Sequence, residues 1–284
     1  MSATVPFTVA SPQSFGGKIR GLMGLPDADK YPGQRPAVVV CHGFKGFMEW
    51  GFFGPLADLL TARGFVTCRF NYSGTGMAPG DELVTDLDAF RRNTFSLERD
   101  ETLRVLDAVE GLGDGNVDEG RIGLVGHSRG GAAAILGAAS EAWRGRLGAL
   151  VTWASISTFE RYAQHHEVWR RDGVLPVKNG RTGQELELGL ELLDDLTSNR
   201  KALDLKAAAG RITAPWLIVH GANDDVVPVE EAAQLASWTS APHQVERIAD
   251  GDHTFGARHP FVGPTAELTR ALNATQLWLR RHLA

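Results

Sequence analysis

Short apolar runs recur along the chain and alternate with longer segments of helical periodicity. Two N-terminal runs, residues 5–10 and 18–25, are joined by a Pro/Gly-rich connection and predict an antiparallel pair of strands. Short apolar runs without alternation are typical of strands that a parallel sheet buries on both faces. Such strands are predicted at residues 37–41, 65–70, 121–125, 148–153, 215–220 and 244–248.

The segments between these runs carry apolar residues at helical spacing. Residues 52–63 place Phe53, Leu56 and Leu60 on one side, and Gly64 follows as a stop signal. Further helices are predicted at residues 95–110, 130–141, 230–238 and 265–282. Strands and helices that alternate in this way predict an α/β fold, with a mostly parallel sheet of about eight strands and helices on both faces.

One long segment interrupts this alternation. Residues 156–213 separate two strands that a single helix would otherwise join, and they contain aromatic residues and a helical run around residues 185–196. We interpret this segment as a cap inserted over the carboxyl edge of the sheet. The core of the fold is then formed by residues 1–155 and 214–284.

A serine lies at the junction of a predicted strand and a predicted helix. Residues 126–130 read Gly-His-Ser-Arg-Gly, which matches the G-x-S-x-G pattern of a nucleophile elbow. A sharp turn there would project the Ser128 hydroxyl above the sheet, and small flanking residues would let the turn approach its neighbours. The sequence therefore predicts Ser128 as a nucleophile.

An acid and a base follow the last two predicted strands. A nucleophile elbow requires the chain order serine, acid, histidine, and these residues come in that order. Asp224 and Asp225 come after the strand at residues 215–220, and His253 comes after the strand at residues 244–248. Because the carboxyl ends of parallel strands meet at one edge, both groups should reach Ser128. We favour Asp224 as the acid, because Asp225 is nearer the following Val-Val-Pro turn and is suited to cap it.

The loop after the first buried strand, residues 42–44, reads His-Gly-Phe. At this place an oxyanion hole requires a backbone N–H, matched by that of the residue after the nucleophile. We predict that Phe44 and Arg129 supply these donors. His42 is expected to fix the loop, and Trp50 and Trp169 are the tryptophans that could line a substrate pocket.

Composition narrows the classes of partner. The chain has 43% hydrophobic and 22% charged residues and a net charge of −5, which does not favour nucleic acid or an anionic membrane as a partner. No apolar run approaches the length of a membrane span, and the N-terminus has no signal-peptide pattern. We expect a cytoplasmic enzyme, monomeric or homodimeric, whose two cysteines, Cys41 and Cys68, are small buried hydrophobes. Neither a metal nor a cofactor is expected.

On these motifs the chain resembles the α/β-hydrolase superfamily. The likeness covers the loop at residues 42–44, the elbow at residues 126–130, the Asp224 loop and His253. Within the superfamily it is similar to the dienelactone-hydrolase-like and serine-aminopeptidase-like branches and to the cinnamoyl and feruloyl esterases. The resemblance implies ester hydrolysis without metal or organic cofactor. The chain has serine where typical dienelactone hydrolases carry cysteine, and it lacks the N-terminal propeller of the oligopeptidases.

The expected function is therefore that of a carboxylesterase that cleaves small or medium acyl or aryl esters through a Ser-His-Asp triad and an acyl-enzyme. A serine peptidase or amidase, or an acyl thioesterase, would use the same residues. A non-catalytic binding module on this scaffold is a further alternative, and it is disfavoured because every triad position is filled.

Overall fold

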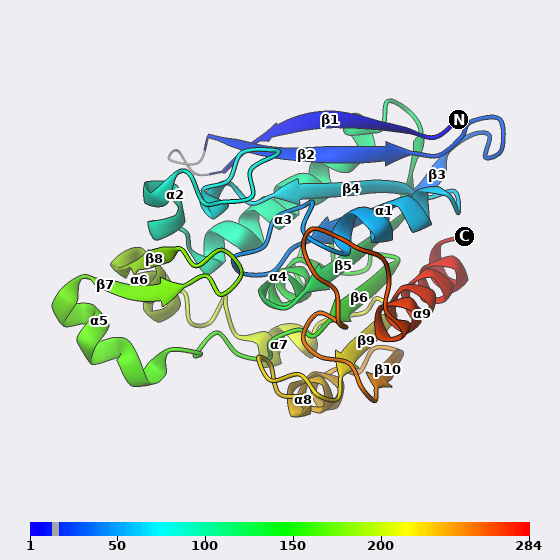
Figure 1. Ribbon diagram of the computed structural model, residues 1–284. Coiled ribbons are helices and arrows are strands. Elements are labelled where there is room, and N and C mark those ends of the chain that lie inside the picture. Colours follow the sequence, from blue (N-terminus) through cyan, green and yellow to red (C-terminus); the bar gives the residue numbers. More distant parts are fainter. Residues whose placement is uncertain (13–16) are drawn as a thin grey trace.

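A computed structural model describes residues 1–12 and 17–284 of the chain. Eight strands form one sheet in the order β1-β2-β4-β3-β5-β6-β9-β10 (Figure 1). The first two strands pair antiparallel with each other, and β2 also runs antiparallel to β4, whereas the remaining neighbours are parallel. The strands are β1 (Ala3–Ala10), β2 (Lys18–Leu25), β3 (Arg35–Cys41), β4 (Val66–Asn71), β5 (Val117–His127), β6 (Ala149–Trp153), β9 (Trp216–Gly221) and β10 (His243–Ile248).

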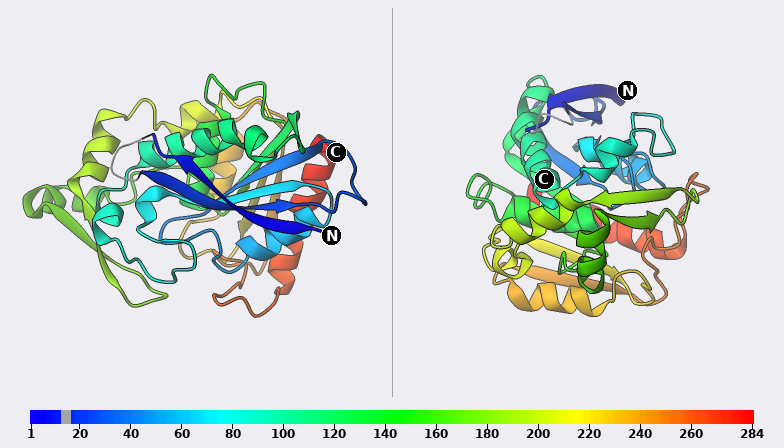
Figure 2. Two further views of the ribbon diagram at one scale, coloured as in Figure 1. Left: turned by 90° about the horizontal axis from the view of Figure 1, so that it is seen from above. Right: turned by 90° about the vertical axis from the view of Figure 1, so that its left-hand side faces the viewer.

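Helices cover both faces of this sheet. The apolar sides of α1 and α9 pack on one face, and those of α3, α4, α7 and α8 pack on the other (Figures 1 and 2). The helices are α1 (Phe53–Thr61), α2 (Leu87–Arg91), α3 (Phe95–Leu112), α4 (Arg129–Ala138), α5 (His166–Asp172), α6 (Leu190–Ser198), α7 (Leu205–Ala209), α8 (Glu230–Trp238) and α9 (Ala266–Leu283). The predicted fold class, a doubly covered and mostly parallel sheet, is confirmed.

The apolar run of β3 shows why the sheet needs two layers of helices. Val38 and Val40 pack toward α1 and α9, whereas Val39 and Cys41 pack toward α3 and α4. Successive side chains of a strand point to opposite faces, so an unbroken apolar run requires cover on both sides. Cys41 and Cys68 are both buried free thiols, as predicted.

The segment between β6 and β9 departs from the prediction. The helical run expected around residues 185–196 begins as a strand, β8 (Glu185–Gly189), which pairs antiparallel with β7 (Val174–Lys178); the helix α6 starts only at Leu190. The reason is visible in the letters Glu-Leu-Glu-Leu-Gly, whose period of two places Leu186 and Leu188 on one buried face.

The hairpin of β7 and β8, together with α5 and α6, extends beyond the carboxyl edge of the main sheet (Figure 1). The last helix of the segment, α7, instead packs against α4 and α8 and belongs to the helical layer of the core. Part of the connection predicted between the first two strands, residues 13–16, lies outside the described residues. Within the described ranges, no helical segment has the length and apolar character that a bilayer crossing demands.

Candidate active site

Ser128 lies in a sharp turn whose flanking residues have no space for a side chain. It lies between β5 and α4 with φ 55° and ψ −122°, a left-handed conformation that is rare for a residue with a side chain. A Cβ on Gly126 would approach the Gly130 carbonyl oxygen to 2.4 Å, and one on Gly130 would approach the His42 carbonyl oxygen to 2.2 Å. Glycine is therefore required at both flanks of the serine.

The serine, the histidine and the aspartate that the motifs singled out lie in one hydrogen-bonded row. His253 Nε2 is 3.0 Å from Ser128 Oγ, and His253 Nδ1 is 2.8 Å from Asp224 Oδ2. Ser128 comes from the elbow, Asp224 from the loop after β9 and His253 from the loop after β10. This arrangement can move a proton from the serine hydroxyl to the imidazole while the carboxylate holds the ring.

The carboxylate of Asp224 is buried and held from three sides. Burial alone would raise its pKa, but hydrogen bonds from His220 and His253 and from the Val227 backbone N–H hold the pKa of Asp224 well below its usual value. The backbone N–H groups of Val226 and Val227 both donate to Asp224 Oδ1, at 2.9 and 2.8 Å. Asp224 thus stays ionised at neutral pH.

This network corrects the role that we predicted for the neighbouring acid. The turn after β9 is capped by Asp224 itself, whereas Asp225 is exposed, and the N-terminus of α8 at Val229 has no side-chain cap. One carboxylate can serve both purposes because its two oxygens face different ways, one toward the turn and one toward the histidine.

His127, the variable residue of the elbow, supports the loop that carries His253. Its Nε2–H donates to the His253 carbonyl oxygen at 2.9 Å, and its ring lies 4.8 Å from the His253 ring. Burial, reinforced by the nearby His253, lowers the pKa of His127 to about 3, so the ring is neutral. His127 therefore fixes the position of the backbone beneath His253.

The His-Gly-Phe loop after β3 passes directly over the serine. A Cβ on Gly43 would lie 3.0 Å from Ser128 Cβ, so the backbone of this loop closes against the elbow. His42 fixes the loop as predicted: its Nδ1–H donates to the Gly43 carbonyl at 2.8 Å, and its Nε2 accepts the Tyr72 backbone N–H at 3.4 Å. Burial lowers the pKa of His42 to about 4.

The side chain of Arg129 connects this loop to the elbow. Its guanidinium lies between two aromatic rings, 4.9 Å from the centroid of Phe44 and 4.5 Å from that of Phe95. Arg129 Nε donates to Glu98 Oε2 of α3 at 2.7 Å, and both side chains are 7% exposed. The first N–H groups of a helix have no partner within it, so the backbone N–H of Arg129 at the start of α4 is available at the site.

A pocket of about 170 Å³ opens beside Ser128. Trp50 and Phe53 form part of its wall, and the β7–β8 turn contributes Asn179 and Arg181. Trp169, the other tryptophan that we predicted for a pocket, does not line it. It is 2% exposed, packs against Tyr162 within the insertion and donates its indole N–H to the Leu188 carbonyl at 3.0 Å.

Sequence reasoning did not find several residues of this site. Glu98 lies on α3 without any motif, and Lys45 follows Phe44 without any signal for a binding role. Asn179 and Arg181 reach the pocket through the fold of the β7–β8 hairpin. The prediction of a helix around residues 185–196 was wrong for Glu185–Gly189, which form β8 of this hairpin. The period of two in β8 was the one signal in the sequence that could have revealed it.

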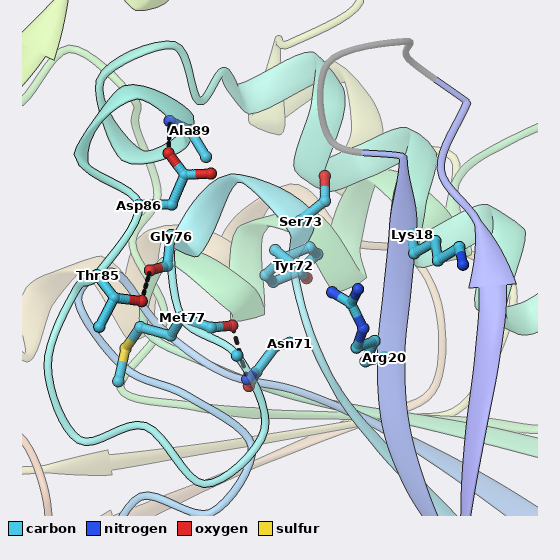
Figure 3. A pocket seen from close by; sticks show the side chains of 11 residues that line it. Lys18, Arg20, Asn71, Tyr72, Ser73, Gly76, Met77, Thr85, Asp86 and Ala89 are labelled. Carbon is cyan, nitrogen blue, oxygen red and sulfur yellow. Dashed lines mark hydrogen bonds between the residues drawn. The ribbon is translucent and has the colours of Figure 1, made fainter.

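A second cavity, also of about 170 Å³, lies apart from Ser128 and is bounded by β2 and the loop after β4 (Figure 3). Arg20 and Lys18 extend from β2, and Asp86 lies on the opposite side and caps α2 through the Ala89 N–H. Asn71, which also lines this cavity, accepts the Met48 backbone N–H at 2.7 Å. Through Asn71, which holds Met48, the cavity adjoins the loop that continues from Phe44.

The lowered pKa values of His42 and His127 predict how stability depends on pH. An unfolded histidine takes up a proton below about pH 6.5, whereas folded His42 and His127 stay neutral until about pH 4 and about pH 3. The unfolded state therefore binds more protons as the pH falls through this window. We expect the free energy of unfolding to drop by about 1.4 kcal/mol per pH unit for each of these histidines.

Urea unfolding between about pH 7 and about pH 5 measures this slope. A His42→Gln variant should show a shallower slope, because one group that takes up a proton on unfolding is gone. The matched control is His165→Gln, which replaces an exposed histidine and should keep the slope of the wild type. An equal slope in His42→Gln and wild type would contradict the assignment.

Comparison with known proteins places this site in a family. A model of the alpha/beta hydrolase family matches residues 38–270, and the chain belongs to that family. The chain is 25% identical over 253 residues to the uncharacterized peptidase YuxL of Bacillus subtilis (strain 168), with 87% of this chain and 35% of YuxL covered. The chain thus spans about a third of the length of that relative.

Two solved structures are similar over almost the whole chain. A putative hydrolase from Agrobacterium vitis S4 has a TM-score of 0.75 at 21% identity, with 98% of this chain and 99% of that one covered. Est1E from Butyrivibrio proteoclasticus has a TM-score of 0.69 at 19% identity, with 98% of both chains covered, and has also been solved with ferulic acid bound. At these identities the likeness concerns the fold.

Proposed function

We propose that this α/β hydrolase is a serine carboxylesterase, with Ser128 as nucleophile, His253 as general base and Asp224 as the acid that orients it. The observation that carries the proposal is the continuous row of hydrogen bonds from Ser128 Oγ through His253 to Asp224 Oδ2, at 3.0 and 2.8 Å. Geometry of this kind activates a hydroxyl that is otherwise a poor nucleophile.

The mechanism is acyl transfer in two steps. His253 takes the Ser128 proton as Oγ attacks the ester carbonyl, and the C–O bond to the alcohol breaks when His253 returns that proton to the leaving oxygen. Water, deprotonated by the same imidazole, then attacks the acyl-enzyme and releases the acid. The backbone N–H groups of Phe44 and Arg129 stabilise the oxyanion in both steps, each typically by about 3 kcal/mol.

Esters of small acyl or aryl groups fit the pocket best. Its volume is about 170 Å³, and aromatic side chains form one wall. Est1E, which shares the fold, binds ferulic acid, an aromatic carboxylic acid. Within residues 156–213, the hairpin of β7 and β8 acts as the cap in this proposal, because its turn forms part of the pocket wall.

Peptidase activity is the second candidate, favoured by the likeness to the peptidase YuxL. Amide bonds place a greater demand on the same groups, since the leaving amine must be protonated as it departs. The experiment compares an ester, a thioester and an anilide of one acyl group, and repeats the ester with acyl chains of increasing length. We expect the highest kcat/KM for the ester and an optimum at short chains. Faster anilide than ester turnover would replace the esterase proposal by the peptidase.

A further inference from the structure

The pocket beside Ser128 has an uneven distribution of charge. Two cationic side chains, Lys45 and Arg181, line it together with neutral and aromatic residues and His253, and no carboxylate is among the lining residues. The whole protein carries a net charge of −5, so this positive site contrasts with the rest of the chain. Cations gathered in a cleft with apolar walls raise the local concentration of anions.

Lys45 is held at the pocket by the backbone of the hairpin. It follows Phe44 directly, at φ 58°, and its Nζ donates to the Lys178 carbonyl at 2.8 Å. That bond uses one of the three ammonium donors, and among the described residues Lys45 forms no ion pair. Burial lowers the pKa of the Lys45 ammonium below its usual value.

Arg181 lines the same pocket from the turn between β7 and β8. Its guanidinium lies 5.3 Å from the centroid of the Phe47 ring, and its Nη2 donates to the Glu82 backbone carbonyl at 3.0 Å. The charge of the Glu82 carboxylate acts on Arg181 from beyond ion-pair distance, and this carboxylate lies 3.4 Å from His259 Nε2. A planar guanidinium fixed in this way retains donors for a second, bidentate partner.

We propose that the ester substrate carries a carboxylate, and that Lys45 and Arg181 bind it while Ser128 attacks the ester carbonyl. This inference rests on the proposed esterase activity and names its substrate class. The two cations come from different elements, the loop that carries Phe44 and the hairpin of the insertion, and they line the same small pocket as the nucleophile. A carboxylate is the smallest common organic anion that a lysine and an arginine can share.

The experiment compares pairs of esters that differ only in charge. One pair is meta-acetoxybenzoate and meta-acetoxybenzamide, with the anion on the alcohol side. The other is the para-nitrophenyl monoester of terephthalate and its carbamoyl analogue, with the anion on the acyl side. We expect kcat/KM for the charged member of at least one pair to exceed that of its neutral partner roughly tenfold or more, as one hydrogen bond between charged groups would give.

Variants of Lys45 and Arg181 test whether these two side chains cause the preference for the charged ester. Arg181→Gln and Lys45→Gln should each reduce the ratio of charged to neutral kcat/KM, mainly through KM for the charged ester, and Arg181→Lys should restore part of it. The matched control is Arg171→Gln, which removes an exposed arginine of α5 that pairs with Asp172 and does not line the pocket, and should keep the wild-type ratio. Added salt should lower the wild-type ratio more than that of Arg181→Gln.

The outcomes separate this inference from the proposed function. If wild type hydrolyses the neutral esters in a Ser128-dependent manner but shows no preference for the charged member of either pair, the carboxylate site is wrong and the esterase stands. If wild type hydrolyses none of the esters while its fold is intact, the esterase proposal itself fails. A preference that persists in Arg181→Gln and Lys45→Gln would also overturn the assignment.

Discussion

Replacing Ser128 by alanine should lower kcat for ester hydrolysis by roughly 10⁴- to 10⁶-fold, because the proposed mechanism then loses its nucleophile. Ser128 Oγ is the hydrogen-bond partner of His253 Nε2, at 3.0 Å. Alanine keeps the Cβ and the turn, so the fold should persist. Hydrolysis of para-nitrophenyl acetate, followed at 405 nm (about the absorbance maximum of the product), measures the loss at these magnitudes.

A fluorophosphonate probe tests the same residue without turnover. Wild type should gain one phosphonyl group on Ser128, detected by the mass of the intact protein, whereas Ser128→Ala should gain none. The control Ser237→Ala removes an exposed hydroxyl on α8 and should react as wild type does. Labelling of Ser128→Ala, or residual turnover above about a hundredth of wild type, would show that the nucleophile lies elsewhere.

Asp224→Asn should lower kcat by about 10³- to 10⁴-fold. The carboxylate accepts hydrogen bonds from His253 and from the turn at Val226 and Val227, and an amide cannot accept from all of them with both of its terminal atoms. The imidazole would then lose its preferred tautomer and the stabilisation of its charge. Because the pKa of Asp224 lies well below its usual value, the residue should add no ionisation to the wild-type pH profile above about pH 4.

The neighbouring acid provides a matched control for this variant. Asp225→Asn makes the same chemical change one residue along, at an exposed position, and should alter kcat by no more than about twofold. Thermal unfolding shows whether either variant is still folded under the assay conditions. Equal losses of activity in Asp224→Asn and Asp225→Asn would mean that general disturbance of the loop, and not the orientation of His253, is responsible.

The core of the fold was predictable because its strands are buried on both faces. An unbroken apolar run such as that of β3 has few alternatives, and the glycines that follow the strands mark where the chain turns. The insertion was less predictable. Glu185 to Gly189 carry both a possible helical stripe and a period of two, and only the pairing with β7, which depends on contacts distant in sequence, decides between them.

Some residues of the site were likewise predictable from the sequence, and others were not. Ser128, Asp224 and His253 each follow a strand of the parallel sheet, so their chain order and the topology are enough to bring them to one edge. Arg181 and Glu98 belong to no such pattern: Arg181 lies in a hairpin turn, and Glu98 lies in the first turn of α3. Their positions follow from packing between elements, which a single sequence does not encode in local spacing.

The stacking of Arg129 between Phe44 and Phe95 orders the loop that carries Phe44, the proposed oxyanion donor, when the protein folds. A flexible loop would lose conformational freedom afresh in each catalytic cycle and would raise the barrier accordingly. Here the Arg129 guanidinium, itself bonded to Glu98, packs on the ring of Phe44 as part of the fold. In the proposed mechanism the backbone donors of Phe44 and Arg129 would therefore be preorganised: the entropy of the loop is lost once, during folding, and would not be lost again as charge develops on the substrate oxygen.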